Sequence, residues 1–221
     1  MKSVIPSLQR VGTFSSGLVR PVSLRREQLA ILLRDASSSM GGDKAREADA
    51  AARALVSELA SSSNGGAFTV AVIDFSSSAA IVCPPKRADQ LADNLPALAA
   101  SGSTNVAAVL SEAERIVRGA PKEVATTRPV VLLFSDGQPN CGGDARSVAN
   151  GLKTVADVVT VAFGSDADES FLREIATSPS HSYRCRDGRE LRRFFGAVGA
   201  TLSQSMAAGI PAAGGLGTLA P

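Results

Sequence analysis

Uninterrupted hydrophobic runs recur along the chain and are separated by segments of other patterns. LAILLRD and VVLLFSD each begin with five consecutive apolar residues and end in an aspartate, a pattern typical of a strand covered on both faces. AAIVCPP follows AFTVAVIDFS after a few small polar residues, and this spacing predicts a hairpin. Strands are therefore predicted at 29–35, 67–76, 79–85, 128–137, 157–164 and 182–186.

Between most of these runs, apolar residues recur at helical spacing. In the first such segment Ala48, Ala52, Leu55 and Leu59 lie on one face, and Asp43 is suited to cap its start. Helices are predicted at 44–61, about 86–98, from Thr104 through Val117, about 143–154, about 168–177 and about 188–205.

Repeated strand–helix units with one hairpin predict an α/β fold. We expect a doubly wound, mostly parallel six-stranded sheet with one antiparallel edge strand and helices on both faces. The organised part is expected to span 27–206. A basic arm at 1–26 precedes it, and an Ala-, Gly- and Pro-rich tail at 207–221 is expected to be flexible.

Composition narrows the class of protein. The 221 residues are 44% hydrophobic and 20% charged, as in a soluble globular protein, and no apolar run approaches a membrane span. A net charge of +2 gives no reason to expect nucleic-acid binding. The charge is uneven, however, because residues 1–34 contain six Lys and Arg but only Glu27 as an acid, and such an arm could contact an acidic partner.

Several types of functional site are not supported. The three cysteines, Cys83, Cys141 and Cys185, form no CxxC pair, which argues against a disulfide framework or zinc site and favours a reducing, cytoplasmic location. The single histidine, His181, is expected in an exposed loop, and there is no GxSxG nucleophile motif. Neither GxGxxG nor GxxxxGK[ST] follows the first strand, so a phosphate-binding loop is not predicted.

Oxygen-bearing residues gather where predicted strands end. Asp35 and Asp136 each end a strand, Ser37 and Ser39 follow the first of them, and Thr104 begins a helix. Ligands bind at the carboxyl edge of such sheets. Two carboxylates and three hydroxyls suit a hard cation such as Mg²⁺, with Mn²⁺ or Ca²⁺ as alternatives.

The motif D-x-S-x-S at 35–39, the threonine of SGSTN and the strand end FSDGQPN resemble the metal-ion-dependent adhesion site of von Willebrand factor A domains. The resemblance covers roughly 28–205 and implies a Rossmann-like fold. It also implies that Ser37 and Ser39 bind the metal directly and that Thr104 binds when a ligand is engaged. Asp35 and Asp136 would bind directly or through water, and an acidic partner side chain would fill the remaining position.

The later segments VVTVAFGSDADESFLREIA and LRRFFGAVGATLSQS are similar to the bacterial tellurium-resistance-associated (TerY-type) group of this family. That similarity implies an intracellular stress-response protein whose partners include a kinase, a phosphatase or a chaperone-like ATPase. One departure from the family motif is Ser38, which stands where glycine is common and could perturb the loop.

Three functions remain open. The first is a non-enzymatic, Mg²⁺-dependent protein-interaction module. The second is a phosphotransferase or phosphatase that uses Asp35, for which Asp43 and Lys44 are candidates by proximity alone. The third is a scaffold with a vestigial metal site, in which the basic arm makes the contacts. Arg34 could steer acidic partners or simply be solvated, and Asp74 is expected to be a turn residue.

Overall fold

The computed structural model describes residues 26–121, 127–136 and 139–219. Within these ranges six strands form one sheet in the order β3-β2-β1-β4-β5-β6, and only the β2–β3 pair is antiparallel. The fold class predicted from the hydrophobic pattern is thus confirmed. The strands are β1 (Gln28–Asp35), β2 (Phe68–Phe75), β3 (Ala79–Arg87), β4 (Val130–Ser135), β5 (Asp157–Phe163) and β6 (Ser182–Cys185).

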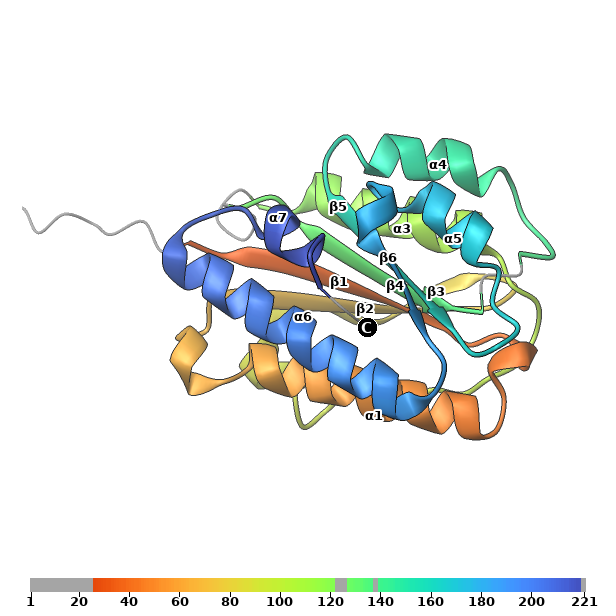
Figure 1. Cartoon of the computed structure of the whole chain (residues 1–221), viewed down its shortest axis with the longest axis horizontal. Coiled ribbons are helices and arrows are strands. Elements are labelled where there is room, and N and C mark those ends of the chain that lie inside the picture. Colours follow the sequence, from red (N-terminus) through yellow and green to blue (C-terminus); the bar gives the residue numbers. More distant parts are fainter. Residues whose placement is uncertain (1–25, 122–126, 137–138, 220–221) are drawn as a thin grey trace, which may run out of the picture.

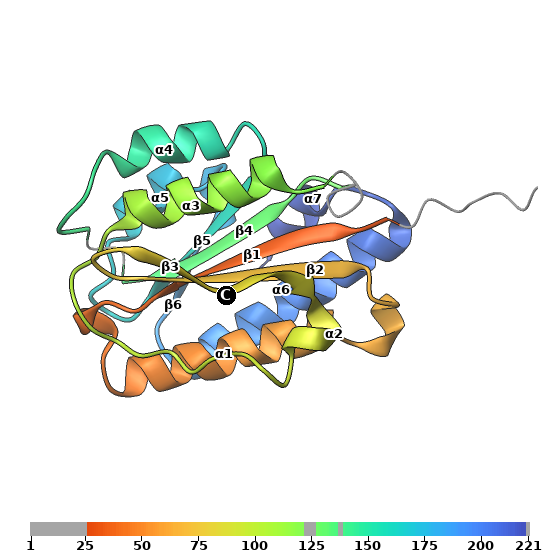
Figure 2. The ribbon, with the colours of Figure 1, turned by 180° about the vertical axis from the view of Figure 1, so that it is seen from behind.

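Helices cover both faces of the sheet (Figures 1 and 2). One face is covered by α1 (Asp43–Leu59), α2 (Ala88–Leu91), α6 (Gly188–Ala208) and α7 (Ala212–Leu216). The other is covered by α3 (Val106–Gly119), α4 (Ala145–Leu152) and α5 (Glu169–Ile175). The described chain also contains the short 3₁₀ turns η1 (Ser38–Met40), η2 (Ser62–Asn64) and η3 (Pro179–His181).

The central strand β1 shows why the fold has two cores. Its side chains alternate between faces: Leu29, Ile31 and Leu33 pack with α3, α4 and α5, whereas Ala30 and Leu32 pack with α1 and α6. All eight residues of β1 are buried. A strand covered on both faces has no solvent-exposed side, which explains the five consecutive apolar residues at its centre.

Two helix predictions need correction at their ends. The helix expected at 86–98 is only α2, Ala88–Leu91; Pro96 disfavours helical backbone at Leu95, so a helix could not run on to 98. The helix expected from Thr104 begins at Val106, and Asn105 caps it by accepting a hydrogen bond from the Ala108 backbone. Asp43 is the first residue of α1, not its cap; Gly42 precedes it with φ 71°.

The segment after 206 differs from the flexible tail that its composition predicts. Helix α6 continues to Ala208, and α7 packs against its end with Leu216 fully buried. The Tyr183 hydroxyl donates to the Leu216 carbonyl, and His181 Nε2 lies 3.1 Å from the Ala213 carbonyl oxygen. His181 is therefore buried rather than exposed, because the returning chain covers it. The predicted arm at 1–26 lies outside the described residues except for Arg26.

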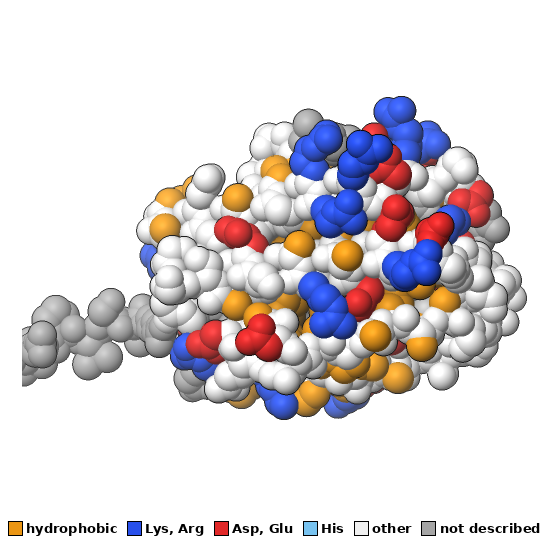
Figure 3. All heavy atoms as spheres, turned by 90° about the horizontal axis from the view of Figure 1, so that it is seen from below, with side chains coloured by type: hydrophobic (Ala, Val, Ile, Leu, Met, Phe, Trp, Pro, Cys, Tyr) orange, Lys and Arg blue, Asp and Glu red, His pale blue; other side chains and the backbone are white. Residues whose placement is uncertain are grey.

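The face covered by α1 and α6 carries basic and acidic side chains in alternation (Figure 3). No continuous region of one charge is visible there. Of the helices in the described ranges, none combines the length and apolarity that a membrane crossing requires. Cys83 and Cys185 are buried, as packing residues should be, while Cys141 is exposed.

Candidate metal centre

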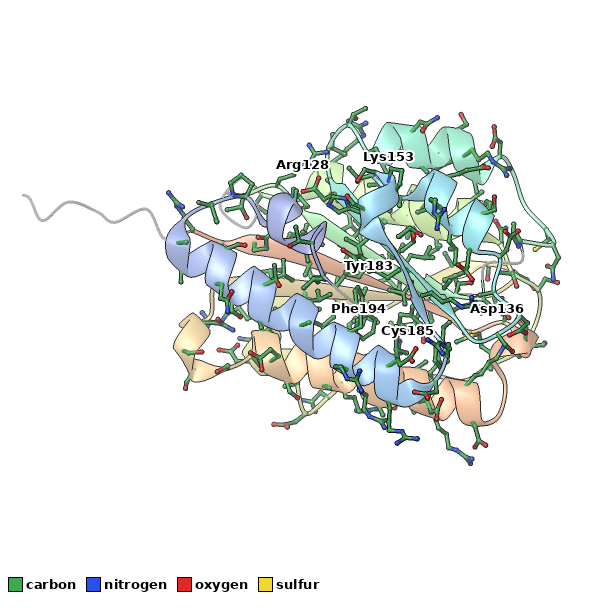
Figure 4. All side chains as sticks on the ribbon, in the orientation of Figure 1. Arg128, Asp136, Lys153, Tyr183, Cys185 and Phe194 are labelled. Atoms are coloured by element: carbon green, nitrogen blue, oxygen red, sulfur yellow. The ribbon has the colours of Figure 1, made fainter. Side chains whose placement is uncertain are left out.

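The candidate centre lies where β1 and β4 end. These two strands are parallel neighbours, and Asp35 is the last residue of β1 while Asp136 follows β4. Their carboxylates consequently meet at the same edge of the sheet, and Figure 4 shows Asp136 at that end of the fold. Both residues are fully buried.

Asp35 is held by hydrogen bonds on both carboxylate oxygens. Oδ1 accepts from the Ser37 backbone N–H at 2.8 Å, and Oδ2 accepts from the Ser135 hydroxyl. Burial raises the pKa of the Asp35 carboxyl; the bonds from Ser135 and Ser37 oppose this increase, and the negative charge of Asp136 adds to it. The side chain is thus fixed in place beside a second negative charge.

The serine loop after β1 brings two hydroxyls together. Ser37 Oγ and Ser39 Oγ lie 3.0 Å apart, with Ser37 buried and Ser39 exposed. Ser38 points elsewhere, because its backbone N–H and its hydroxyl both donate to the Gly102 carbonyl, at 3.0 and 2.9 Å. No non-glycine residue in the described ranges has a positive φ, so serine at position 38 causes no backbone strain.

Asp136 is the unusual member of the set. Its side chain is 0% exposed, and neither carboxylate oxygen has a hydrogen-bond partner. Its backbone carbonyl accepts from Asp168 N at 2.6 Å. Burying an ionised carboxylate without a partner is costly, so charged groups in protein interiors are paired or bind metals. The donor set therefore fits a hard cation at this position.

Thr104 lies in the loop that leads into α3. It is 2% exposed, and its backbone forms a reciprocal pair with Asn140: Thr104 N donates to Asn140 Oδ1 at 2.8 Å, and Asn140 N donates to the Thr104 carbonyl at 3.2 Å. Asn140 belongs to the loop that follows Asp136. Asn140 ends the motif FSDGQPN, but the motif alone gives no sign of this contact.

The five predicted side chains differ in how directly the structure links them. Hydrogen bonds connect Asp35 with Ser37 and Ser37 with Ser39, and electrostatic repulsion connects Asp35 with Asp136. Thr104 is linked to the loop after Asp136 through Asn140, and its own segment contacts the serine loop at Gly102. The described residues contain no group of three or more His, Cys, Asp or Glu side chains placed to hold a metal ion.

The charged residues near the candidate centre form ion pairs that the sequence does not predict. Arg34 is neither solvated nor available for steering: it is fully buried and donates to both carboxylate oxygens of Asp74, at 2.6 and 2.8 Å. Asp74 is thus an ion-pair partner at the end of β2. Asp43 pairs with Arg46, and Lys44 Nζ contacts Asp166 Oδ1 at 2.7 Å.

Comparisons with known proteins agree with this architecture. The model of the von Willebrand factor type A domain matches residues 30–197. No curated protein matches the sequence. A von Willebrand factor type A protein from Catenulispora acidiphila shares 22% identity at a TM-score of 0.66, covering 80% of this chain and 42% of that one.

Two further solved structures share the fold. Proximal thread matrix protein 1 from the mussel byssus, solved with a zinc-occupied MIDAS motif, is 19% identical with a TM-score of 0.66 and covers 82% of this chain and 48% of that one. The domain of the type V pili tip protein Mfa5 from Porphyromonas gingivalis is 12% identical with a TM-score of 0.69, covering 84% and 97%. The chain spans less than half the length of the mussel and Catenulispora proteins. With the family model matching most of its length, the chain belongs to the von Willebrand factor type A domain family.

Proposed function

We propose that Asp35, Ser37, Ser39, Thr104 and Asp136 bind a divalent cation, with Mg²⁺ preferred and Mn²⁺ or Ca²⁺ as alternatives. The observation that carries the proposal is the buried carboxylate of Asp136, whose two oxygens lack any hydrogen-bond partner. A cation would compensate this charge and the repulsion between Asp136 and Asp35. The zinc-occupied motif of the mussel protein supports the binding of a divalent metal at this position of the fold.

The donor set also supports a role in capturing a partner. Three of the five side chains are neutral hydroxyls, and these compensate a divalent charge less than carboxylates do. A bound cation would therefore attract an additional anionic oxygen at this edge. A carboxylate from an acidic side chain of a partner protein has the required charge and hardness. The domain would then act as a metal-dependent protein-interaction module.

The module is proposed to bind its partner without transforming it. A phosphotransferase would need further catalytic groups next to Asp35, but Lys44 contacts Asp166 and Asp43 contacts Arg46. The similar structures include a byssus matrix protein and a pilus tip protein, and those roles are compatible with adhesion or assembly. The scaffold with a vestigial site gains no support from the buried Asp136 carboxyl, whose oxygens have no hydrogen-bond partner.

We also propose a biological setting, based on the similarity of the later segments to the TerY-type group. We place the protein in the cytoplasm, in a bacterial stress response of the tellurium-resistance type. A kinase, phosphatase or chaperone-like ATPase of the same system would supply the acidic side chain, and neither nucleic acid nor a membrane takes part. Affinity purification with Mg²⁺ and with EDTA tests this: a specific partner should be lost with the metal, and a partner retained equally in both would contradict metal-dependent capture.

Metal binding itself is tested by isothermal titration of the full chain with Mg²⁺, Mn²⁺, Ca²⁺ and Zn²⁺. The wild type should bind one equivalent and Asp35→Ala should bind none. Asp89→Ala is the matched control, because Asp89 is an exposed aspartate at the start of α2 whose partner is Arg87. Equal binding by wild type and Asp35→Ala would remove the proposed site.

A further inference from the structure

Arg34 is a fully buried arginine in the central strand, directly before Asp35. Its guanidinium makes four hydrogen bonds in three directions. Nε and Nη2 donate to Asp74 at the end of β2, at 2.6 and 2.8 Å. Nη1 donates to Asp49 Oδ1 of α1 and to the Pro96 carbonyl, each at 3.0 Å. One side chain therefore connects β1, β2, α1 and the segment after α2.

Stability alone gives no reason for this arginine. Ala30 and Leu32 precede it on the same face of β1 and lie in the hydrophobic core. Replacing a buried ion pair by apolar residues of similar volume is often neutral or stabilising, because the desolvation of the charges offsets their attraction. An arginine at this place is better explained by the geometry that its fixed donors impose on their acceptors.

One acceptor belongs to the segment that carries Thr104. This segment, residues 92–105, is called the crossing loop because it runs from α2 on one face to α3 on the other. It passes the serine loop, where Ser101 N donates to the Ala36 carbonyl at 2.6 Å. The Gly102 carbonyl accepts from Ser38, as described above.

The end of the crossing loop is fixed by the β2–β3 turn. Ser103 N donates to Ser77 Oγ at 3.0 Å, and Asn105 N donates to the Ser76 carbonyl at 2.8 Å. That turn directly follows β2, the strand in which Asp74 binds Arg34. The guanidinium thus holds the crossing loop directly, through the Pro96 carbonyl. It also holds it indirectly, through Asp74, because β2 leads into the turn that binds the end of the crossing loop.

We propose that Arg34 is a positioning residue for the metal centre, which sets the place of Thr104 by fixing the crossing loop through the Pro96 carbonyl and Asp74. This inference rests on the proposed function, since it assumes that Thr104 contributes to metal binding. Arg34 does not touch the metal. Outer groups that orient metal ligands typically change metal affinity by about 10–100-fold.

The first test is isothermal titration of Mg²⁺ into Arg34→Lys. Lysine keeps the charge, so the electrostatic field at the centre is preserved, but a single ammonium cannot reproduce the three-way set of bonds. We expect the Kd for Mg²⁺ to rise about tenfold. If Arg34→Lys does not fold, Asp74→Asn serves as the second variant, because it weakens the hold on the guanidinium and should raise the Kd in the same direction.

Arg128→Lys is the matched control. Arg128 donates Nε to Asp157 at 2.7 Å and Nη2 to the carbonyls of Lys153 and Ala156, at 2.7 and 2.9 Å. It precedes β4, at the opposite end of that strand from Asp136 (Figure 4). Its substitution should lower stability and leave the Kd for Mg²⁺ within about twofold. An equal rise in both variants would indicate a general loss of stability and overturn the proposal.

A double-mutant cycle with Thr104→Ala separates positioning from other effects. If Arg34 acts through Thr104, Arg34→Lys should add little to the Kd once the threonine is absent, so the two effects are non-additive. Full additivity would overturn the proposal even if Arg34→Lys alone weakens binding. If Arg34→Lys binds Mg²⁺ as tightly as the wild type does, the positioning role is wrong but the proposed function stands. If the wild type binds no metal, the proposed function is wrong as well.

Discussion

The substitution Asp136→Asn should stabilise the metal-free protein while removing its response to metal. Asparagine has nearly the same shape as aspartate but no charge. In the metal-free state, the wild-type carboxylate is buried with both oxygens unpartnered and repels Asp35. Removing that charge therefore removes an unfavourable interaction from the folded state, so the free energy of unfolding should increase.

Because asparagine is still buried and polar, the gain is only the difference between burying a charged and a neutral group without partners. A neutral group costs about 1–3 kcal/mol and a charged one more, so we take a difference of about 1–3 kcal/mol. For a domain of this length, 1 kcal/mol shifts the melting temperature by about 2–4 °C. Asp136→Asn in EDTA should accordingly melt about 3–10 °C above wild type. Metal present at about 1,000 times its Kd stabilises the wild type by about 4 kcal/mol, so in Mg²⁺ the order of stability should reverse.

Thermal and urea unfolding followed by circular dichroism, in EDTA and in Mg²⁺, test this reversal. Asp157→Asn is the matched control, since Asp157 is equally a buried aspartate near a strand end but is paired with Arg128. It should lose about 1–3 kcal/mol in both conditions, because it removes the carboxylate charge that pairs with Arg128. An Asp136→Asn protein that is less stable than wild type in EDTA would refute the reasoning, since the carboxylate would then have an unrecognised partner.

Four further outcomes are expected. Asn140→Ala should raise the Kd for Mg²⁺ about tenfold in calorimetry, because the Thr104 backbone loses its acceptor; unchanged affinity would exclude a role for this pair. Ser38→Gly should cost about 0.5–1 kcal/mol in urea unfolding, because serine is unstrained there and its hydroxyl bond to Gly102 is lost. The Kd should not change, since the backbone N–H at position 38 still donates to the Gly102 carbonyl. Leu216→Ala should cost about 2–5 kcal/mol, whereas a flexible tail would predict no loss. In thiol titration of the native protein, Cys141 alone should react rapidly. Cys83 and Cys185 are buried, and burial raises the pKa of the Cys185 thiol to about 12.

The sheet could be predicted from the sequence because burial on two faces leaves a strong local signal. The runs at 29–35 and 157–164 correspond to β1 and β5 within one residue at each end. Strand ends then locate the carboxyl edge, so Asp35 and Asp136 could be associated although about a hundred residues separate them. That both carboxylates lie at this edge follows from parallel pairing of β1 with β4. Metal binding by the set stays a prediction.

Polar side chains with distant partners could not be predicted, because their burial depends on groups that no local pattern identifies. Arg34 follows five apolar residues, and its acceptors are 15, 40 and 62 positions away. From the sequence, a charged residue at a strand end is expected to be solvated. The same holds for Asn140, which contacts Thr104 across 36 positions.

His181 is buried by a segment whose composition suggested flexibility. In each case the hydrophobic pattern determines the layers, whereas hydrogen bonds between loops determine the geometry at the edge. Where function depends on ligand positions to a fraction of an ångström, these long-range bonds are the part of the structure that a change of sequence is most apt to disturb without changing the fold.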